Sequence, residues 1–313
     1  ACRAEHPVSE SVREKVAMFS NVEPARVFSM HDRESIYTIP EAMREEGLDR
    51  EVLTILDLHH RVNVRHEDQA RARWSNFTER IRSPRRYELT IGLLGKYAAL
   101  RDAYASIDKA IEHSSTHLSA RVHTEWIDTT DLTPERVADL LGEDVHGVIV
   151  PGGFGERGVE GKIRCVQYVR THGIPYLGIC LGFQVAVIEY ARHILNLDQA
   201  NSTEFTVDTR YPVIAELPEQ KQIEGLGGTM RLGVQDVLIE PGTLAAHLYQ
   251  DREMIREWFR HRYEVDPDYI EELQRAGLLF SGRHPRQPIM QIAELPRDAP
   301  HAQGGRGART PAR

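Results

Sequence analysis

A cysteine at position 180 stands between two glycines where an apolar strand pattern changes to a helical one. Residues 174–179 form a short apolar run typical of a buried strand, and helical spacing begins at Val185. The run Gly178-Ile179-Cys180-Leu181-Gly182 is the cysteine counterpart of a nucleophile elbow, whose strained turn points the side chain out of the sheet. The following helix N-terminus favours the thiolate, and the amide of Leu181 points to where an oxyanion would form. We expect nucleophilic catalysis at Cys180; the alternative is a buried structural cysteine at a Gly-rich turn.

Other segments could complete such a site. Gly152-Gly153-Phe154-Gly155 follows an apolar strand, and the amide of Gly153 is a candidate second oxyanion donor, although alone the segment would be only a flexible loop. Gln184 lies one helical turn after the cysteine and can face the same pocket. The guanidinium of Arg262 is suited to bind a carboxylate in a bidentate pair. Taken singly, Gln184 and Arg262 are more often surface residues, and 201–205 is more often an ordinary turn.

A cysteine nucleophile also needs a base. The histidines that follow the elbow are His193, His247, His261, His284 and His301. None lies in a histidine-x-glutamate context, which would supply both a base and the carboxylate that orients it. The sequence therefore leaves the role of base unfilled.

Composition limits the class of protein. A chain of 313 residues can bury a sizeable core and form more than one domain, and its net charge of −8 argues against nucleic-acid binding as the main role. The three cysteines show no metal-ligand spacing and suit a reducing compartment. Because no apolar run approaches the roughly 20 residues of a membrane span and no signal peptide is visible, we expect a cytoplasmic protein. Because the chain starts at Ala1 rather than Met, we expect a fragment.

The order of the elements predicts an α/β domain from residue 87 onward. Apolar strand patterns alternate with helical ones, which is typical of a doubly wound, mostly parallel sheet covered on both faces. The strands are expected at 89–94, 120–127, 145–150 and 174–179, with helices at 102–113, 133–141 and 159–171. After Asn201, shorter segments alternate polar and apolar residues and predict a short antiparallel flap. These segments are 211–217, 229–239, 277–281 and 289–294.

The first 86 residues have a different pattern. We expect a helix at 16–22, a strand at 25–30, an extended stretch at 35–40 and a helix at 41–56. In the charged segment 65–82, Trp74, Phe77 and Ile81 recur at helical spacing and predict a surface helix that docks by one narrow stripe. Ser83-Pro84-Arg85-Arg86 then predicts a linker. At the other end, 297–313 is rich in Gly, Pro, Ala and Arg, and we expect a disordered or aberrant tail.

Five motifs, in order, closely resemble the CTP synthase family. They are Val150–Lys162, Gly178–Gly182, Ala200–Phe205, Gly227–Gly233 and His261–Val265. The resemblance, which runs from about Cys2 to Pro296, implies a class I glutamine amidotransferase domain of flavodoxin-like fold that releases ammonia from glutamine. It also implies a P-loop-type synthetase domain that uses ATP and Mg²⁺ to convert UTP to CTP. By resemblance, 1–57 is the end of the synthetase domain, 58–86 a helical linker and 87–296 the amidotransferase domain.

The resemblance also implies roles for individual residues. Cys180 matches the nucleophile, and Gly153 and Leu181 match the oxyanion amides and contact glutamine. The remaining glutamine-binding positions are matched by Gln184, Glu204 and Arg262.

Further matches concern nucleotides. Lys15 would contact the uridine nucleotide, and His31-Asp32-Arg33 would lie at the ATP adenine, although the family more often has Lys-Asp-Val there. The stretch 154–162 resembles the lid loop through which the family responds to GTP, an allosteric activator. The Mg²⁺ ligands belong to upstream sequence, so no metal site is expected in this chain.

The resemblance ends after Pro296, where the family continues to a Phe-His-Pro-Glu segment that completes its catalytic triad. We therefore expect glutamine binding with impaired turnover, and dependence on the absent part of the synthetase domain. The family also implies homotetramers. Two alternatives are a catalytically silent module that binds glutamine or a partner, and another class I cysteine amidohydrolase. Residues 1–57 argue against the second, which would not need them.

Overall fold

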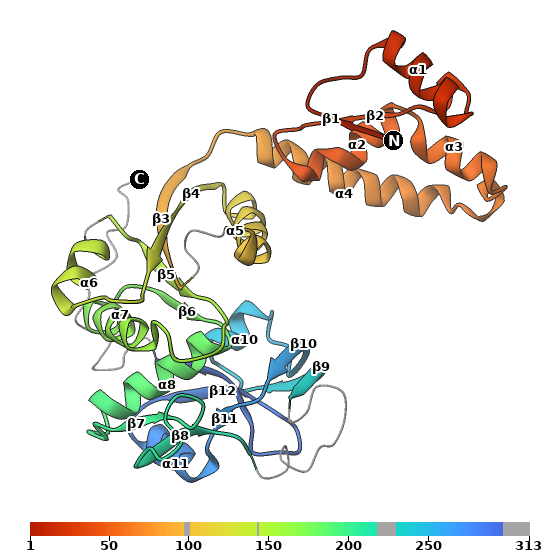
Figure 1. Cartoon of the computed structure of the whole chain (residues 1–313). Helices are drawn as coiled ribbons and strands as arrows, with labels where there is room; N and C mark the ends of the chain where they lie inside the picture. Colours follow the sequence, from red (N-terminus) through yellow and green to blue (C-terminus); the bar gives the residue numbers. More distant parts are fainter. Residues whose placement is uncertain (97–100, 143, 218–229, 297–313) are drawn as a thin grey trace. The chain divides into compact units, whose positions relative to one another are not determined.

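Residues 1–96, 101–142, 144–217 and 230–296 are described by a computed structural model (Figure 1). The contacts divide the chain into two compact units, Ala1–Tyr87 with Ser114–Ala120, and Glu88–His113 with Arg121–Arg313. Within the described ranges, no helix is both long and apolar enough to cross a membrane. The predicted tail at 297–313 lies outside the described residues, and the domain boundaries expected after residues 57 and 86 stay predictions.

The first unit is mainly helical. Its helices are α1 (Glu10–Ser20), α2 (Ile39–Glu45), α3 (Leu48–Ile55) and α4 (Val64–Arg82). The short strands β1 (Cys2–Ala4) and β2 (Ser29–His31) pair in parallel, so the strand expected at 25–30 forms only near its end. The helix expected at 16–22 begins earlier, at Glu10. The helix expected at 41–56 is divided because Gly47, with φ of 82°, separates α2 from α3.

The extended stretch predicted for 35–40 is wrong. The side chain of Ser35 accepts a hydrogen bond from the Tyr37 amide at 3.3 Å, and the Thr38 hydroxyl donates to the Ser35 carbonyl at 2.8 Å. These local bonds wind Ile36–Thr38 into a 3-10 turn that continues into α2. Tyr37 and Thr38 of this turn are buried, whereas Ile36 is 52% exposed.

Helix α4 docks by the predicted stripe. The indole of Trp74 donates to the Tyr37 carbonyl at 2.9 Å, and the ring of Phe77 meets the Tyr37 ring edge-on at 5.3 Å between centroids. Ile81 is half-buried on the same face. The prediction of a surface helix held by one narrow stripe is therefore confirmed.

The second unit contains the predicted α/β sheet, with strand order β4-β3-β5-β6. Its strands are β3 (Tyr87–Gly95), β4 (Ala120–Asp128), β5 (Gly147–Val150) and β6 (Tyr176–Gly178). Strand β5 pairs in parallel with both β3 and β6. The helices that alternate with the strands are α5 (Ala105–His117), α6 (Pro134–Leu140), α7 (Val159–His172) and α8 (Leu181–His193). This alternation confirms the predicted doubly wound α/β fold.

Helices α7 and α8 pack side by side (Figure 1). Val159 and Ile163 of α7 join the apolar cluster around α8, whereas Cys165 and Val169 join the cluster under β3, β4 and β5. Helix α8 itself is buried along most of its length. A helix enclosed in this way gives Cys180, at its N-terminus, a rigid support.

The antiparallel part is larger than the short flap that we expected. The strands β9 (Arg231–Ile239), β10 (Met254–His261), β12 (Leu279–Arg283) and β13 (Met290–Glu294) form one sheet in the order β10-β9-β12-β13. A second small sheet is mixed: β8 (Tyr211–Ala215) pairs in parallel with β7 (Ala200–Ser202) and in antiparallel with β11 (Glu264–Val265). The helices here are α10 (Leu244–Leu248) and α11 (Pro267–Arg275). We did not predict β10 because this edge strand is largely exposed and carries many charged residues.

Candidate active site

The elbow predicted at Cys180 is present. Strand β6 ends at Gly178, helix α8 begins at Leu181, and Cys180 between them has φ of 55° and ψ of −106°. A residue other than glycine is strained in this conformation and keeps it only where the surroundings hold it. The half-buried thiol therefore stands at the carboxyl end of the parallel strands, at the N-terminus of a buried helix.

Two glycines allow this turn. A Cβ atom on Gly182 would lie 2.2 Å from the carbonyl oxygen of Val150, and one on Gly178 would lie 2.6 Å from the backbone of Gly182. The amide of Ile179 also donates to the Val150 carbonyl at 2.9 Å. The close approach of β5 to the start of α8 explains why small residues flank the cysteine.

The glycine-rich loop after β5 lies against the elbow. A Cβ atom on Gly152 would be 3.3 Å from Cys180 Cβ and 3.7 Å from its Sγ, and one on Gly153 would be 3.5 Å from Leu181 Cδ2. The loop and the elbow therefore form two sides of one site. This arrangement brings the predicted oxyanion residues, Gly153 and Leu181, together beside the thiol.

Gln184 and Glu204, which were predicted to bind glutamine, make hydrogen bonds to segments around the elbow. The amide nitrogen of Gln184, which is 5% exposed, donates to the carbonyl of Tyr263 at 2.8 Å. Oε1 of Glu204 accepts a hydrogen bond from the Gly155 amide at 2.8 Å. The first contact joins α8 to the segment after β10, and the second joins the glycine-rich loop to the segment after β7.

Arg262 also belongs to this group. Its Nε is buried and has no hydrogen-bond partner among the described residues. Burial, followed by the charge of Glu204, raises the pKa of Tyr263 although Arg262 opposes the shift. A guanidinium with a buried, unused Nε donor can bind the α-carboxylate of an amino acid, and a carboxylate such as that of Glu204 can bind the α-ammonium group.

His261 and Glu264 lie close together where β10 ends. Nδ1 of His261 lies 3.5 Å from Oε2 of Glu264. The side chain of His261 is 14% exposed and that of Glu264 is 1% exposed. Burial alone would lower the pKa of His261, but its contacts with Cys180 and Glu264 and their negative charges raise this pKa to about 9.

Sequence reasoning did not single out the His261–Glu264 pair. We looked for a histidine and a glutamate two residues apart, whereas His261 and Glu264 are three apart and the chain turns between β10 and β11. The visible signal was a histidine and a glutamate on either side of Arg262, within one of the five motifs. His301 lies outside the described residues.

The lid region carries several positive charges. Lys96 donates to the carbonyl of Phe154, and Arg157 donates to the Lys96 carbonyl at 2.9 Å. Lys162 is 3% exposed, and burial together with the charges of Lys96 and Arg157 lowers its pKa to about 8, against the attraction of Asp128. Cationic groups thus gather behind the loop at 154–158.

The other cysteines differ from Cys180. Cys165 is fully buried in α7, and burial raises the pKa of its thiol to about 12. Cys2 is half-buried in β1 of the first unit. Cys180 alone among the three combines a strained turn with a polar site.

In the first unit, three of the four predicted nucleotide-binding residues share a cavity of about 470 Å³. Its lining includes His31, Asp32 and Arg33, and Arg3 forms an ion pair with Asp32 at its edge. Lys15 is exposed on α1 and does not line this cavity. In the described ranges no group of three His, Cys, Asp or Glu side chains could hold a metal ion.

Comparisons with known families agree with this geometry. The profile of "Glutamine amidotransferase class-I" matches residues 99–302, and that of "CTP synthase N-terminus" matches residues 1–58. The chain is 44% identical over 295 residues to the CTP synthase of Desulfitobacterium hafniense (strain Y51), which covers 94% of this chain and 54% of the relative. Over 299 residues it is also 44% identical to the CTP synthase of Methanocaldococcus jannaschii, again with 94% and 54% covered. The chain spans about half the length of these curated relatives.

A solved structure is similar to this chain in sequence and fold. It is described as "Trypanosoma brucei CTPS - glutaminase domain with bound acivicin". Its sequence identity to this chain is 35% and the TM-score is 0.59, with 66% of this chain and 79% of the other covered.

Proposed function

Since the chain belongs to the CTP synthase family and carries a class-I glutamine amidotransferase domain, we propose that it hydrolyses glutamine at Cys180. The ammonia released would serve the ATP-dependent amination of UTP to CTP. The observation that supports this most directly is the elbow at Cys180, set against the glycine-rich loop and beside Glu204 and Arg262.

Glutamine would be held by its two charged ends. The guanidinium of Arg262, with its buried Nε, would bind the α-carboxylate as a charge-assisted pair. The carboxylate of Glu204 would accept hydrogen bonds from the α-ammonium group. Gln184 donates through its amide nitrogen to Tyr263, so its amide oxygen can accept from the same ammonium.

The chemistry would then proceed at the side-chain amide of glutamine. Sγ of Cys180 attacks the amide carbon, and the carbonyl oxygen becomes an oxyanion near the amides of Gly153 and Leu181. The C–N bond breaks and ammonia leaves once the nitrogen has received a proton. Water then cleaves the thioester, which gives glutamate and restores the thiol.

The nucleotide steps are proposed for the synthetase domain, of which 1–57 would be the end. The cavity at His31, Asp32 and Arg33 has the cationic and polar groups to hold the adenine end of ATP, whereas Lys15 would contact the uridine nucleotide from elsewhere. Mg²⁺ does not fit the described residues, which contain no suitable cluster of ligands, and we derive no step through it. GTP would act as an activator at the loop 154–162, where Lys96 and Arg157 supply positive charge. As in the resemblance, we propose a homotetramer.

Glutamine turnover in a matched pair of arginine variants tests the proposal. Arg262→Met should raise KM for glutamine by roughly 10–100-fold, because a charge-assisted hydrogen bond to the substrate is lost. The control is Arg260→Met, at an exposed neighbour on β10, which should leave KM unchanged. The measurement is glutamate and ammonia production. Glutamine binding without hydrolysis would instead favour the silent module, and cleavage of other γ-glutamyl amides in preference would favour another amidohydrolase.

A further inference from the structure

The hydroxyl of Tyr176 lies inside the elbow turn. Strand β6, which begins at Tyr176, runs into α8 through the turn at Cys180 (Figure 1). The Tyr176 hydroxyl donates a hydrogen bond to the carbonyl oxygen of Gly182, in the first turn of α8, at 2.7 Å. A Cβ atom on Gly178 would lie 2.7 Å from the same hydroxyl oxygen. The absence of a side chain at Gly178 therefore leaves the space that this hydroxyl fills.

The rest of the Tyr176 side chain is anchored in the core. Its ring packs against both apolar clusters, the one around α8 and the one under β3, β4 and β5. Burial, followed by the negative charge of Glu189, raises the pKa of the Tyr176 hydroxyl. The hydroxyl therefore keeps its proton at neutral pH and remains a hydrogen-bond donor to the elbow.

The main chain of the elbow is held from the helix side as well. The carbonyl of Ile179 accepts from the Gly182 amide at 2.9 Å, and the carbonyl of Cys180 accepts from the Gln184 amide at 3.1 Å. Leu181 is the first residue of α8, so its amide has no acceptor within the helix and is free to serve as the oxyanion donor of the proposed function. The direction of this amide depends on how the first turn of α8 is held against β6.

We propose that Tyr176 is a positioning residue, which holds the Cys180 thiol and the Leu181 amide in the geometry that glutamine hydrolysis requires. The inference rests on the proposed function. The bond from Tyr176 to Gly182 joins strand to helix across the cysteine and closes a ring of main chain around it.

The strained conformation of Cys180 explains why such a bond matters. A residue other than glycine keeps a φ of 55° only where its surroundings hold it there. Without the bond to Gly182, the turn can relax, and the thiol and the Leu181 amide then shift relative to the substrate. A displacement of about 1 Å between reacting groups can cost on the order of 10²-fold in rate.

A second tyrosine of α8 provides a matched control. The hydroxyl of Tyr190 donates to the carbonyl of Ala276, also at 2.7 Å, but further along the helix. Tyr176→Phe and Tyr190→Phe therefore each remove one hydroxyl and one hydrogen bond to a main-chain carbonyl. Tyr176→Phe should lower kcat for glutamine by roughly 10–100-fold with KM changed by less than about twofold, whereas Tyr190→Phe should leave both constants within about twofold of the parent. The measurements are glutamate production and, as a check on folding, thermal unfolding.

Restoring the donor separates the hydrogen bond from the packing of the ring. Replacing Tyr176 by 4-aminophenylalanine keeps an N–H donor at the same ring position and should recover most of the kcat lost in Tyr176→Phe. A general loss of stability would lower the rate in both phenylalanine variants and would not respond to the donor. Equal kcat in Tyr176→Phe and Tyr190→Phe, or a folded 4-aminophenylalanine variant as slow as Tyr176→Phe, overturns the proposal.

Alkylation of Cys180 by iodoacetamide at pH 7 supplies a measurement that does not need glutamine. Tyr176→Phe should slow it by roughly threefold or more, because the thiol moves away from the helix N-terminus that favours the thiolate, and Tyr190→Phe should not. Slower alkylation in Tyr176→Phe alone, in a protein that does not hydrolyse glutamine, would refute the proposed function and leave the positioning role standing. Glutamine hydrolysis at the same rate in the parent and in Tyr176→Phe would refute the positioning role and leave the proposed function standing.

Discussion

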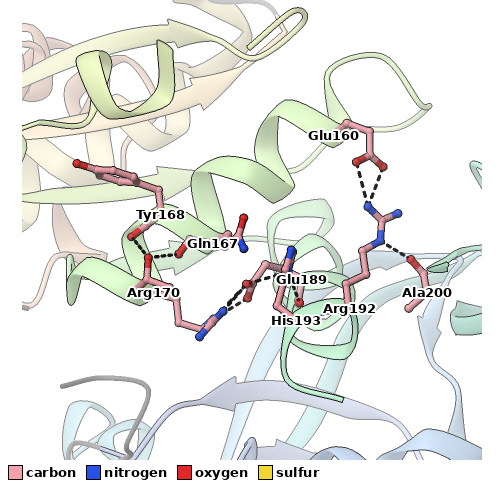
Figure 2. Close-up of polar contacts among 9 residues, drawn as sticks. Glu160, Gln167, Tyr168, Arg170, Glu189, Arg192, His193 and Ala200 are labelled. Carbon is pink, nitrogen blue, oxygen red and sulfur yellow. Dashed lines mark hydrogen bonds and ion pairs between the residues drawn. The ribbon is translucent and has the colours of Figure 1, made fainter. Parts of the chain in front are cut away.

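Two buried clusters in the second unit are made of the same three residue types, an arginine, a glutamate and a histidine. In the first, Nε of Arg170 on α7 donates to both carboxylate oxygens of Glu189 on α8 at 2.9 and 3.1 Å, and Nη2 donates at 2.7 Å (Figure 2). His193 lies one turn along α8, and its Nδ1 donates to the main-chain carbonyl of Glu189 at 3.0 Å. Both residues that face Glu189, Arg170 and His193, therefore make hydrogen bonds to it.

The second cluster, Arg231, Glu264 and His261, is incompletely bonded. Nε of Arg231 donates to Glu264, but Nη2 approaches the same oxygen at 3.0 Å without hydrogen-bond geometry. Nδ1 of His261 is buried and stands 3.5 Å from the carboxylate, at the outer limit of a hydrogen bond. Of the two clusters, this is the one in which Cys180 contributes to a raised pKa of the histidine.

The difference separates a structural role from a chemical one. A saturated buried pair such as Arg170–Glu189 holds α7 against α8, and removing either partner leaves an uncompensated charge. The Glu264 cluster keeps unused hydrogen-bonding capacity at the Nδ1 of its histidine. Residue types alone do not distinguish the two clusters; the completeness of their hydrogen bonding does.

The largest expected effect concerns the nucleophile itself. Cys180→Ser should lower glutamine hydrolysis by at least about 10⁴-fold, because the nucleophile, its base and the oxyanion donors act as a unit. It should also abolish covalent labelling by 6-diazo-5-oxonorleucine. Cys165→Ser and Cys2→Ser serve as controls and should retain labelling. Labelling that persists in Cys180→Ser would show that the elbow is not the reactive site.

A matched pair of glutamate variants tests the comparison directly. Glu189→Gln should destabilise the protein by about 3–5 kcal/mol, since Arg170 would be left buried and unpaired, with little change in the pH dependence of Cys180 alkylation. Glu264→Gln should lower the alkylation rate at pH 7 relative to pH 10 in addition to any loss of stability. The measurements are denaturant unfolding and alkylation. Identical alkylation profiles for the two variants would remove the functional distinction between the clusters.

Lys162 carries a buried charge outside both clusters. Its pKa of about 8 lies below the unfolded value of 10.5, so between these values the unfolded state binds more protons and stability rises with pH. Below pH 8 the cost of burying the charge is fully present. Lys162→Met should therefore stabilise the protein at pH 7 by about 1–3 kcal/mol, and this gain should shrink as pH rises toward 10.5. Unfolding curves at pH 7 and pH 10 measure it; a gain that does not change with pH contradicts the assignment.

The smallest effect concerns backbone strain at the elbow. Cys180 has a positive φ, whereas Arg170 and Glu189 lie in regular helix. Glycine adopts a positive φ without penalty, whereas alanine does not. Cys180→Gly should therefore be more stable than Cys180→Ala by about 1 kcal/mol. Thermal unfolding of the two variants measures the difference. The same pair of substitutions at Cys165, within α7, is the control and should give the opposite order, because glycine weakens a helix interior. Equal stability of the two Cys180 variants would mean that the turn is unstrained.

Much of the fold and part of the site could be predicted from the sequence because the determining residues are neighbours. The elbow needs only a short apolar strand, five residues with two glycines and the start of a helix. The α4 stripe needs only the spacing of Trp74, Phe77 and Ile81. By contrast, the turn at 35–40 was predicted as extended, since local side-chain bonds from Ser35 outweighed its apolar pattern.

The contact between the elbow helix and the segment after β10 was decided by tertiary structure. Gln184 and Tyr263 are 79 residues apart in sequence, and they meet because β10 pairs with β9 and the chain then turns into β11. The same turn places Oε2 of Glu264 3.5 Å from Nδ1 of His261. No local pattern specifies such a contact, because long-range strand pairing depends on how separate segments bury their apolar faces together. The sequence alone determined where a nucleophile would stand; the pairing of distant strands determined which segment would contact its helix.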